Sequence, residues 1–124
     1  MTDQELLRLL RLAALAAGLE LRWSHEWPGG GCFMRRLVPE PEYPGSKWAP
    51  WRPLVDDGDA LRLAVALNLG ISIPVHRTIR ADVISFRDSS VSARECGNDP
   101  CSAVRRAIVR AAADIGRRME KEPT

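Results

Sequence analysis

The stretch that decides the fold is WRPLVDDGDALRLAVALNLGI, residues 51–71. Three aspartates, Asp56, Asp57 and Asp59, stand immediately before apolar residues that recur at helical spacing. Carboxylates in a first helical turn accept hydrogen bonds from the free amide groups and complement the positive end of the helix dipole. The pattern therefore predicts a helix over 57–69 whose start these aspartates cap.

The same three carboxylates have a second interpretation, in which they hold a divalent metal in a hydrolase. A calcium loop of the EF-hand type needs a bidentate glutamate further along, but residues 60–70 contain no carboxylate. No histidine or other carboxylate stands at a recognisable metal-ligand spacing from the cluster. Helix capping is therefore favoured, and a metal-dependent hydrolase built on Asp56, Asp57 and Asp59 is the weaker alternative.

The rest of the chain predicts two further helices, at 2–17 and 99–119, from the spacing of apolar residues. Asp99 is the expected N-cap of the second, because Pro100 follows at the first helical position. Alternating apolar and polar residues predict strands at 19–23, 32–37, 71–76, 78–86 and 90–95. This order predicts one α+β domain over 1–124. We expect a helix–sheet–helix sandwich, with three helices on a mostly antiparallel sheet of about four to five strands.

A segment rich in proline and tryptophan, residues 39–53, is predicted to be an irregular loop. Long loops inside compact domains are often functional, and tryptophan and arginine dominate binding hot spots. Trp48, Trp51 and Arg52 are therefore candidate binding residues. The alternative is that the tryptophans anchor the loop to the core.

The charge of the chain limits its role in binding nucleic acid. The formal net charge of the 124 residues is only +2, so the molecule as a whole does not attract polyanions strongly. A local row of cations does occur on the last predicted helix. It comprises Arg106, Arg110, Arg117 and Lys121, with Arg105 and Arg118 beside them. Such a row could follow a phosphate backbone or an acidic protein surface, and a solvated outer face is the alternative.

The motifs of common enzymes and metal sites do not occur. Cys32, Cys96 and Cys101, with His25 and His76, lack the paired spacing of zinc signatures. Cys101 falls near a helix start, where thiols can become reactive. There is no nucleophile elbow and no glycine-rich phosphate loop. An odd cysteine count without an export signal favours a cytoplasmic protein, and no apolar run is long enough for a membrane span. We therefore predict no catalytic residue, no metal, no cofactor and no membrane association.

Two segments, 51–71 and 97–119, carry a family resemblance. They are similar to the W-x-P-L-x-D-D-G-D-A-L-R-L-A and A-x-R-R-A-I-V-R-A-A-A motifs of small phage and prophage proteins with a phage ABA-sandwich domain. The matching residues are Trp51, Pro53, Leu54, Asp56, Asp57, Gly58, Asp59, Ala60, Leu61, Arg105, Arg106, Ala107, Ile108, Val109, Arg110 and Ala111. The resemblance implies a layered helix–sheet–helix fold and a phage or prophage origin. It implies no catalytic residue and no cofactor, and residues 39–50 depart from the family pattern.

The leading hypothesis is a phage-encoded, non-enzymatic binding module that acts in the host cytoplasm. Its partner would be a host protein, such as a component of a CRISPR-type defence complex, in the manner of an anti-CRISPR inhibitor. The loop tryptophans and the last-helix arginines would form its binding surfaces. The alternative is a nucleic-acid or nucleotide binder that uses the arginine face. Assembly into a homo-oligomer stays open.

Overall fold

The computed structural model describes residues 2–25, 31–38, 47–73, 80–86, 91–97 and 99–121. Each predicted strand overlaps an observed one, and a further strand, β3, lies inside the segment predicted as an irregular loop. Residues 39–46 of that segment are outside the described part. The described elements are α1 (Asp3–Ala17), β1 (Leu21–Ser24), β2 (Cys32–Arg36), β3 (Trp48–Pro50), α2 (Asp57–Ala66), β4 (Leu69–Ser72), β5 (Arg80–Ser85), β6 (Ser92–Cys96) and α3 (Pro100–Lys121).

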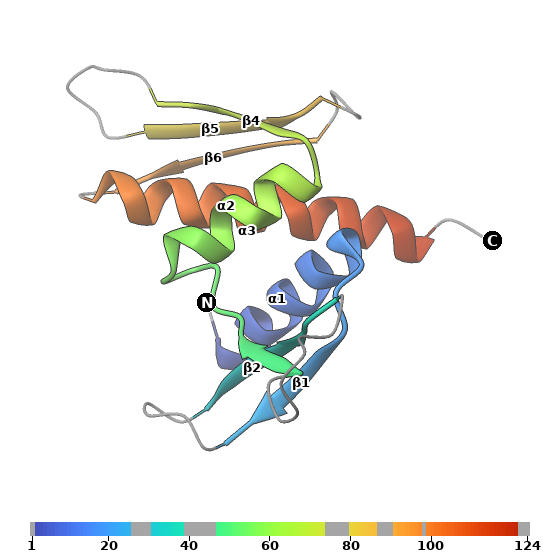
Figure 1. Ribbon diagram of the computed structural model, residues 1–124. Helices are drawn as coiled ribbons and strands as arrows, with labels where there is room; N and C mark the ends of the chain where they lie inside the picture. The colour runs from blue at the N-terminus through green and yellow to red at the C-terminus, as the bar shows by residue number, and fades with distance from the viewer. Residues whose placement is uncertain are drawn as a thin grey trace.

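The α+β class is confirmed, but the prediction of a single sheet is wrong. The strands form two antiparallel three-stranded sheets, a first sheet in the order β1-β2-β3 and a second in the order β4-β5-β6. The sheets are separate because α2 follows β3 and carries the chain away before β4 begins (Figure 1).

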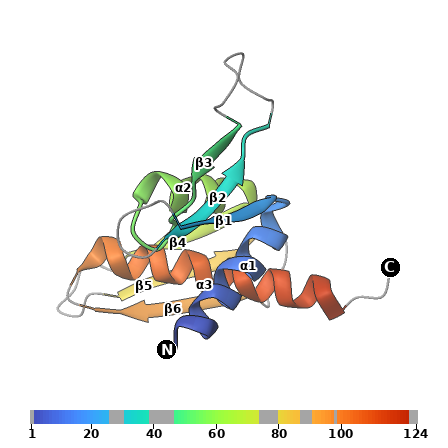
Figure 2. The same ribbon diagram turned by 90° about the horizontal axis from the view of Figure 1, so that it is seen from below.

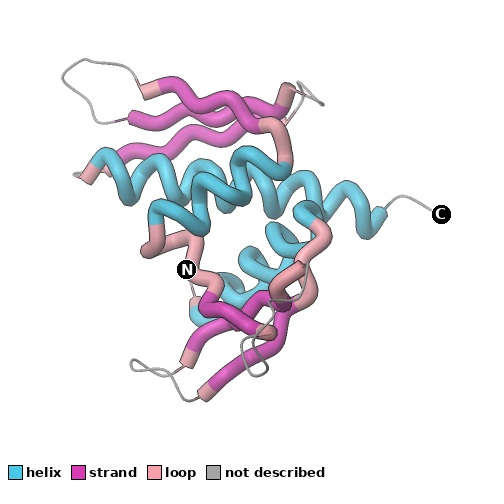
Figure 3. Tube along the Cα trace, in the orientation of Figure 1, coloured by secondary structure: helices cyan, strands magenta, loops and turns pink. Residues whose placement is uncertain are grey.

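The layers are also arranged differently from the expected helix–sheet–helix sandwich. The second sheet packs on one side of α3 through β5 and β6, and α1 packs on another side of α3. Helices therefore separate the two groups of strands, as Figure 3 shows in cyan and magenta. Seen from below, in Figure 2, α1 crosses α3, and Figure 1 shows the two sheets on opposite sides of α3. The central element of the fold is thus a helix and not a sheet.

Local signals explain where the helices begin. The Thr2 hydroxyl accepts a hydrogen bond from the Glu5 amide at 3.2 Å, and the Glu5 carboxylate accepts one from the Thr2 amide at 2.8 Å. This reciprocal pair is a capping box. At α3, the Asp99 carboxylate accepts a hydrogen bond from the Cys101 amide at 3.2 Å. Helix α2 ends three residues earlier than predicted, because Asn68 adopts a left-handed conformation with φ of 56°.

The centre of α3 is made of small residues, which lets its neighbours approach closely. Its fully buried residues include Ala103, Ala107, Ala111, Ala112 and Ala113. At Gly116 the approach is too close for a side chain, since a Cβ atom there would lie 1.9 Å from the backbone oxygen of Leu12 in α1. Helices α1 and α3 are therefore in backbone contact at this point. Around them, Phe33, Trp51, Leu63, Val83 and Ile108 belong to one buried cluster.

Candidate functional site

The three aspartates of the opening motif have three different environments. Asp59 is 4% exposed, and its two carboxylate oxygens have separate partners. Oδ2 accepts a hydrogen bond from the Arg52 amide at 2.9 Å, and Oδ1 accepts one from Nη2 of Arg62 at 2.6 Å. Asp59 thus fastens the segment before α2 to the helix itself.

The other two aspartates have different partners. Asp56 is the N-cap of α2, and its carboxylate accepts a hydrogen bond from the Asp59 amide at 3.0 Å. Asp57 forms an ion pair of 2.5 Å with Arg105 of α3, whose Nε also donates to the Leu54 carbonyl at 2.9 Å. Among the described residues, no three histidine, cysteine, aspartate or glutamate side chains lie together in a way that could hold a metal ion.

The residues of the expected tryptophan surface differ in how far they are exposed. Trp51 is only 3% exposed and belongs to the buried cluster, which supports the alternative that it anchors this segment to the core. The Trp51 amide donates a hydrogen bond to the Phe33 carbonyl at 2.8 Å. This bond holds Trp51 beside β2 of the first sheet. Trp48 is half-buried in β3, with the Arg22 guanidinium 5.0 Å from its ring centroid. Arg52 is exposed.

The arginines of α3 lie beside carboxylates of the same chain. Nε of Arg110 lies 2.5 Å from Glu95 of β6, and Nε of Arg106 lies 3.8 Å from the same carboxylate. Arg117 lies 3.8 Å from Asp114 one turn earlier. Arg105, as described above, faces α2. The predicted cationic row is therefore divided among different neighbours, with Arg106 and Arg110 sharing the single carboxylate of Glu95.

The thiols and the described histidine form no common site. Cys32 is buried, and this burial raises the pKa of its thiol, whereas Cys96 and Cys101 are exposed. All three are free thiols. Nδ1 of His25 accepts a hydrogen bond from the indole N–H two residues earlier at 3.2 Å. His76 lies outside the described residues.

An apolar groove of about 290 Å³ lies where α2, α3 and β4 meet. Leu61 of α2 and Ile71 of β4 line it, together with Ile73, and these side chains are 59%, 39% and 51% exposed. Val104 and Ile108 of α3 complete the lining. The Asp57–Arg105 ion pair and Cys101 also border this space. We call this feature the α2–α3 groove.

Of the residues around the α2–α3 groove, the sequence pointed to Arg105 as a binding residue, to Asp57 as a helix cap and to Cys101 as a candidate reactive thiol, but not to the aliphatic lining. The sequence of α2 did contain one indication of this apolar lining. Leu61 and Val65 stand four residues apart on α2 and are 59% and 72% exposed, so the helix has an apolar stripe that does not face the core. The contribution of Ile71 and Ile73 depends on how β4 folds back beside α2, which no local pattern reveals.

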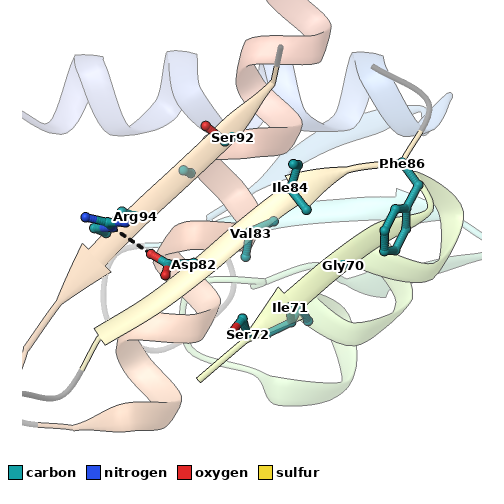
Figure 4. Close-up of a pocket in the computed structure, with 10 residues that line it drawn as sticks. Gly70, Ile71, Ser72, Asp82, Val83, Ile84, Phe86, Ser92 and Arg94 are labelled. Atoms are coloured by element: carbon teal, nitrogen blue, oxygen red, sulfur yellow. Dashed lines mark hydrogen bonds and ion pairs between the residues drawn. The ribbon is translucent and has the colours of Figure 1, made fainter. Parts of the chain in front are cut away.

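A second hollow, of about 670 Å³, lies on the face of the second sheet that is turned away from α3. We call this side of the second sheet the outer face. Figure 4 shows Phe86 and Ile84 at one end of it, and Asp82 joined to Arg94 at the other. Phe86 is 70% exposed and Ile84 is 42% exposed.

Comparison with models of protein families, with curated proteins and with solved structures gave no match to this chain. Within the described ranges, no helix is both long enough and apolar enough to cross a membrane.

Proposed function

We propose that this chain is a non-enzymatic binding module that holds a protein partner in the α2–α3 groove. The observation that carries the proposal is the set of partly exposed aliphatic side chains around one apolar hollow. Leu61, Ile71 and Ile73 leave between 39% and 59% of their surface uncovered. Contiguous apolar surface of this kind, bordered by polar groups, is typical of interaction sites on monomeric proteins.

The groove also has a rigid polar border. Only 15% of the Arg105 side chain is exposed, because it is held by both Asp57 and the Leu54 carbonyl. A fixed ion pair beside an apolar centre offers a partner directional contacts without a large entropy cost on binding. Covering the aliphatic side chains would contribute about 25 cal/mol for each Å² of apolar surface removed from water.

The biological setting of the proposal comes from the family resemblance. The motifs at 51–71 and 97–119 support a phage or prophage origin, and small accessory proteins of phages commonly act by binding host components. The proposed partner is accordingly a host protein, such as a component of a defence complex, met in the host cytoplasm. Binding of nucleic acid through the α3 arginines has less support, because Arg106, Arg110 and Arg117 are paired within the chain.

The test is affinity capture from host lysate, followed by mass spectrometry, with and without nuclease. Leu61→Asp places a charge at the groove and should abolish capture of the partner. Val38→Asp is the matched control, since Val38 is 83% exposed and lies in a different part of the chain. Thermal melting should show that both variants fold.

The expected result is a protein that wild type and Val38→Asp retain and Leu61→Asp loses, whether or not nuclease is present. Equal capture by all three proteins would refute the groove as the binding site. Loss of all captured proteins on nuclease treatment would refute the proposal of a direct protein partner.

A further inference from the structure

The outer face is a sheet surface with only one of its two sides packed. On β5, Ala81, Val83 and Ser85 point toward α3, and each is about 1% exposed. The alternate residues Asp82 and Ile84 point the other way, because successive side chains of a strand lie on opposite faces. In Figure 1, no described element lies on this second side of the sheet. Its residues are therefore available to a ligand.

Phe86 is held at one end of the outer face with most of its surface open. The tip of its ring lies over Gly70 of the neighbouring strand, and a Cβ atom at position 70 would come within 2.6 Å of Cζ. The absence of a side chain at Gly70 thus creates the space that the ring occupies. An aromatic ring that is 70% exposed on a sheet surface is suited to stacking on a planar group.

At the other end of the outer face, two arginines share one carboxylate. Oδ1 of Asp82 accepts a hydrogen bond from Nε of Arg94 at 2.7 Å, and Oδ2 lies 3.3 Å from Nε of Arg80. The three side chains together have a net charge of +1. Because Asp82 contacts Arg94 through Nε, and 64% of the Arg94 side chain is exposed, its terminal nitrogens can donate to an anion. Asp82 therefore orients Arg94 without using the groups that bind phosphate.

The size of the outer face favours a small ligand over a second copy of this chain as the molecule that binds there. Three strands of four to six residues cover roughly 10 Å by 17 Å. A stable protein interface buries about 800 Å² on each partner, which is several times this area. Two or three stacked nucleotides, the number that a comparable sheet surface holds in known RNA-binding modules, fit the space.

We infer that the outer face binds single-stranded nucleic acid, with a base stacked on Phe86 and a phosphate held by Arg94. An exposed ring and a cationic group at opposite ends of one short sheet face can hold a base and a phosphate of the same strand. Ser72 and Ser92 lie on the same face and supply hydroxyl groups for hydrogen bonds to base or sugar. A double helix hides its bases from stacking, so unpaired strands are expected to bind better than duplex. This inference is independent of the α2–α3 groove.

The test is fluorescence anisotropy with purified full-length protein at about 50 mM salt. The probes are a labelled 12-nucleotide RNA, a DNA of the same sequence, and the duplex of each. We expect both single strands to bind more tightly than their duplexes, and a difference between RNA and DNA would identify the preferred sugar. Phe86→Ala should weaken binding about tenfold, and Phe86→Tyr should keep most of it.

Arg94→Gln should weaken binding and reduce the slope of log affinity against log salt by about one, as loss of a single phosphate contact predicts. Arg8→Gln is the matched control, because Arg8 is 68% exposed on α1 and should leave affinity unchanged. Circular dichroism checks that each variant folds. The inference is overturned by no binding of either single strand, by equal affinity for duplex, by wild-type affinity of Phe86→Ala, or by an equal effect of Arg8→Gln and Arg94→Gln.

Discussion

Gly116→Ala tests whether the contact between α1 and α3 limits the stability of the fold. Helix propensity alone predicts that this change stabilises α3 by about 1 kcal/mol, because glycine is a poor helix former. The structure predicts the opposite sign. The new Cβ would lie 1.9 Å from the oxygen and 2.7 Å from the carbonyl carbon of Leu12, and both are backbone atoms that cannot rotate away.

The size of the effect follows from how far the helices must separate. Restoring an ordinary contact requires α1 to withdraw by more than about 1 Å, which loosens the packing around Leu12 and Ala113. Overpacking of this kind typically costs 1–3 kcal/mol and sometimes more, so we expect a net loss of about 2 kcal/mol. For a domain of this size, that loss corresponds to a fall in Tm of about 5–10 °C.

The assay is thermal and urea unfolding followed by circular dichroism, with Gly58→Ala as the matched control. Gly58 is also a helical glycine, but a Cβ there would meet only side-chain atoms of Asp56 and Arg62, at 3.1 Å or more. These flexible groups can move, so Gly58→Ala should leave Tm unchanged or raise it slightly. An unchanged or raised Tm for Gly116→Ala would refute the close approach of the two helices.

Three further changes test local features of the structure. Asp59→Ala leaves the Arg52 amide without its acceptor and should lower the free energy of unfolding by about 3 kcal/mol in urea titrations; a loss below half of that value would contradict the buried hydrogen bonds. Thr2→Ala removes the α1 cap and should cost about 1 kcal/mol in the same titrations, while an unchanged midpoint would argue against the capping box. Iodoacetamide should alkylate Cys101 in the native protein well before Cys32, because burial keeps the Cys32 thiol protonated; peptide mapping showing equal rates would exclude this difference.

The sequence predicted the helices well because their signals are local. Thr2 and Asp99 each supply a capping side chain at the first turn, and such contacts form between residues a few positions apart. The number of sheets could not be predicted in this way, since strand pairing joins residues distant in the chain. The three residues of β3, Trp48–Pro50, include a proline and follow a proline-rich segment, so they have the composition of a loop.

The candidate site was harder to predict than the fold. Arg105 was expected to contact a partner, and it does lie beside the α2–α3 groove, but its link to Asp57 joins positions 48 residues apart. Trp51 shows the opposite case. Its residue type suggested a binding role, while its burial depends on packing against Leu63 and other distant residues that no spacing rule reveals. Residue type therefore indicated which side chains matter, and tertiary contacts determined what each one does.

The central position of α3 has a consequence for how the chain folds during synthesis. Among the described elements α3 is the last along the chain, yet the second sheet and α1 both pack against it. Until residues 100–121 have left the ribosome, Val83 and Ala13 lack the α3 part of their buried cluster. At translation rates of about 5–20 residues per second, the strands of the second sheet are exposed for a second or more before their partner helix has been synthesised. We therefore expect the chain to reach its native state only after α3 has emerged. Before that point, the unpacked strands of the second sheet are the part of the chain most accessible to chaperones.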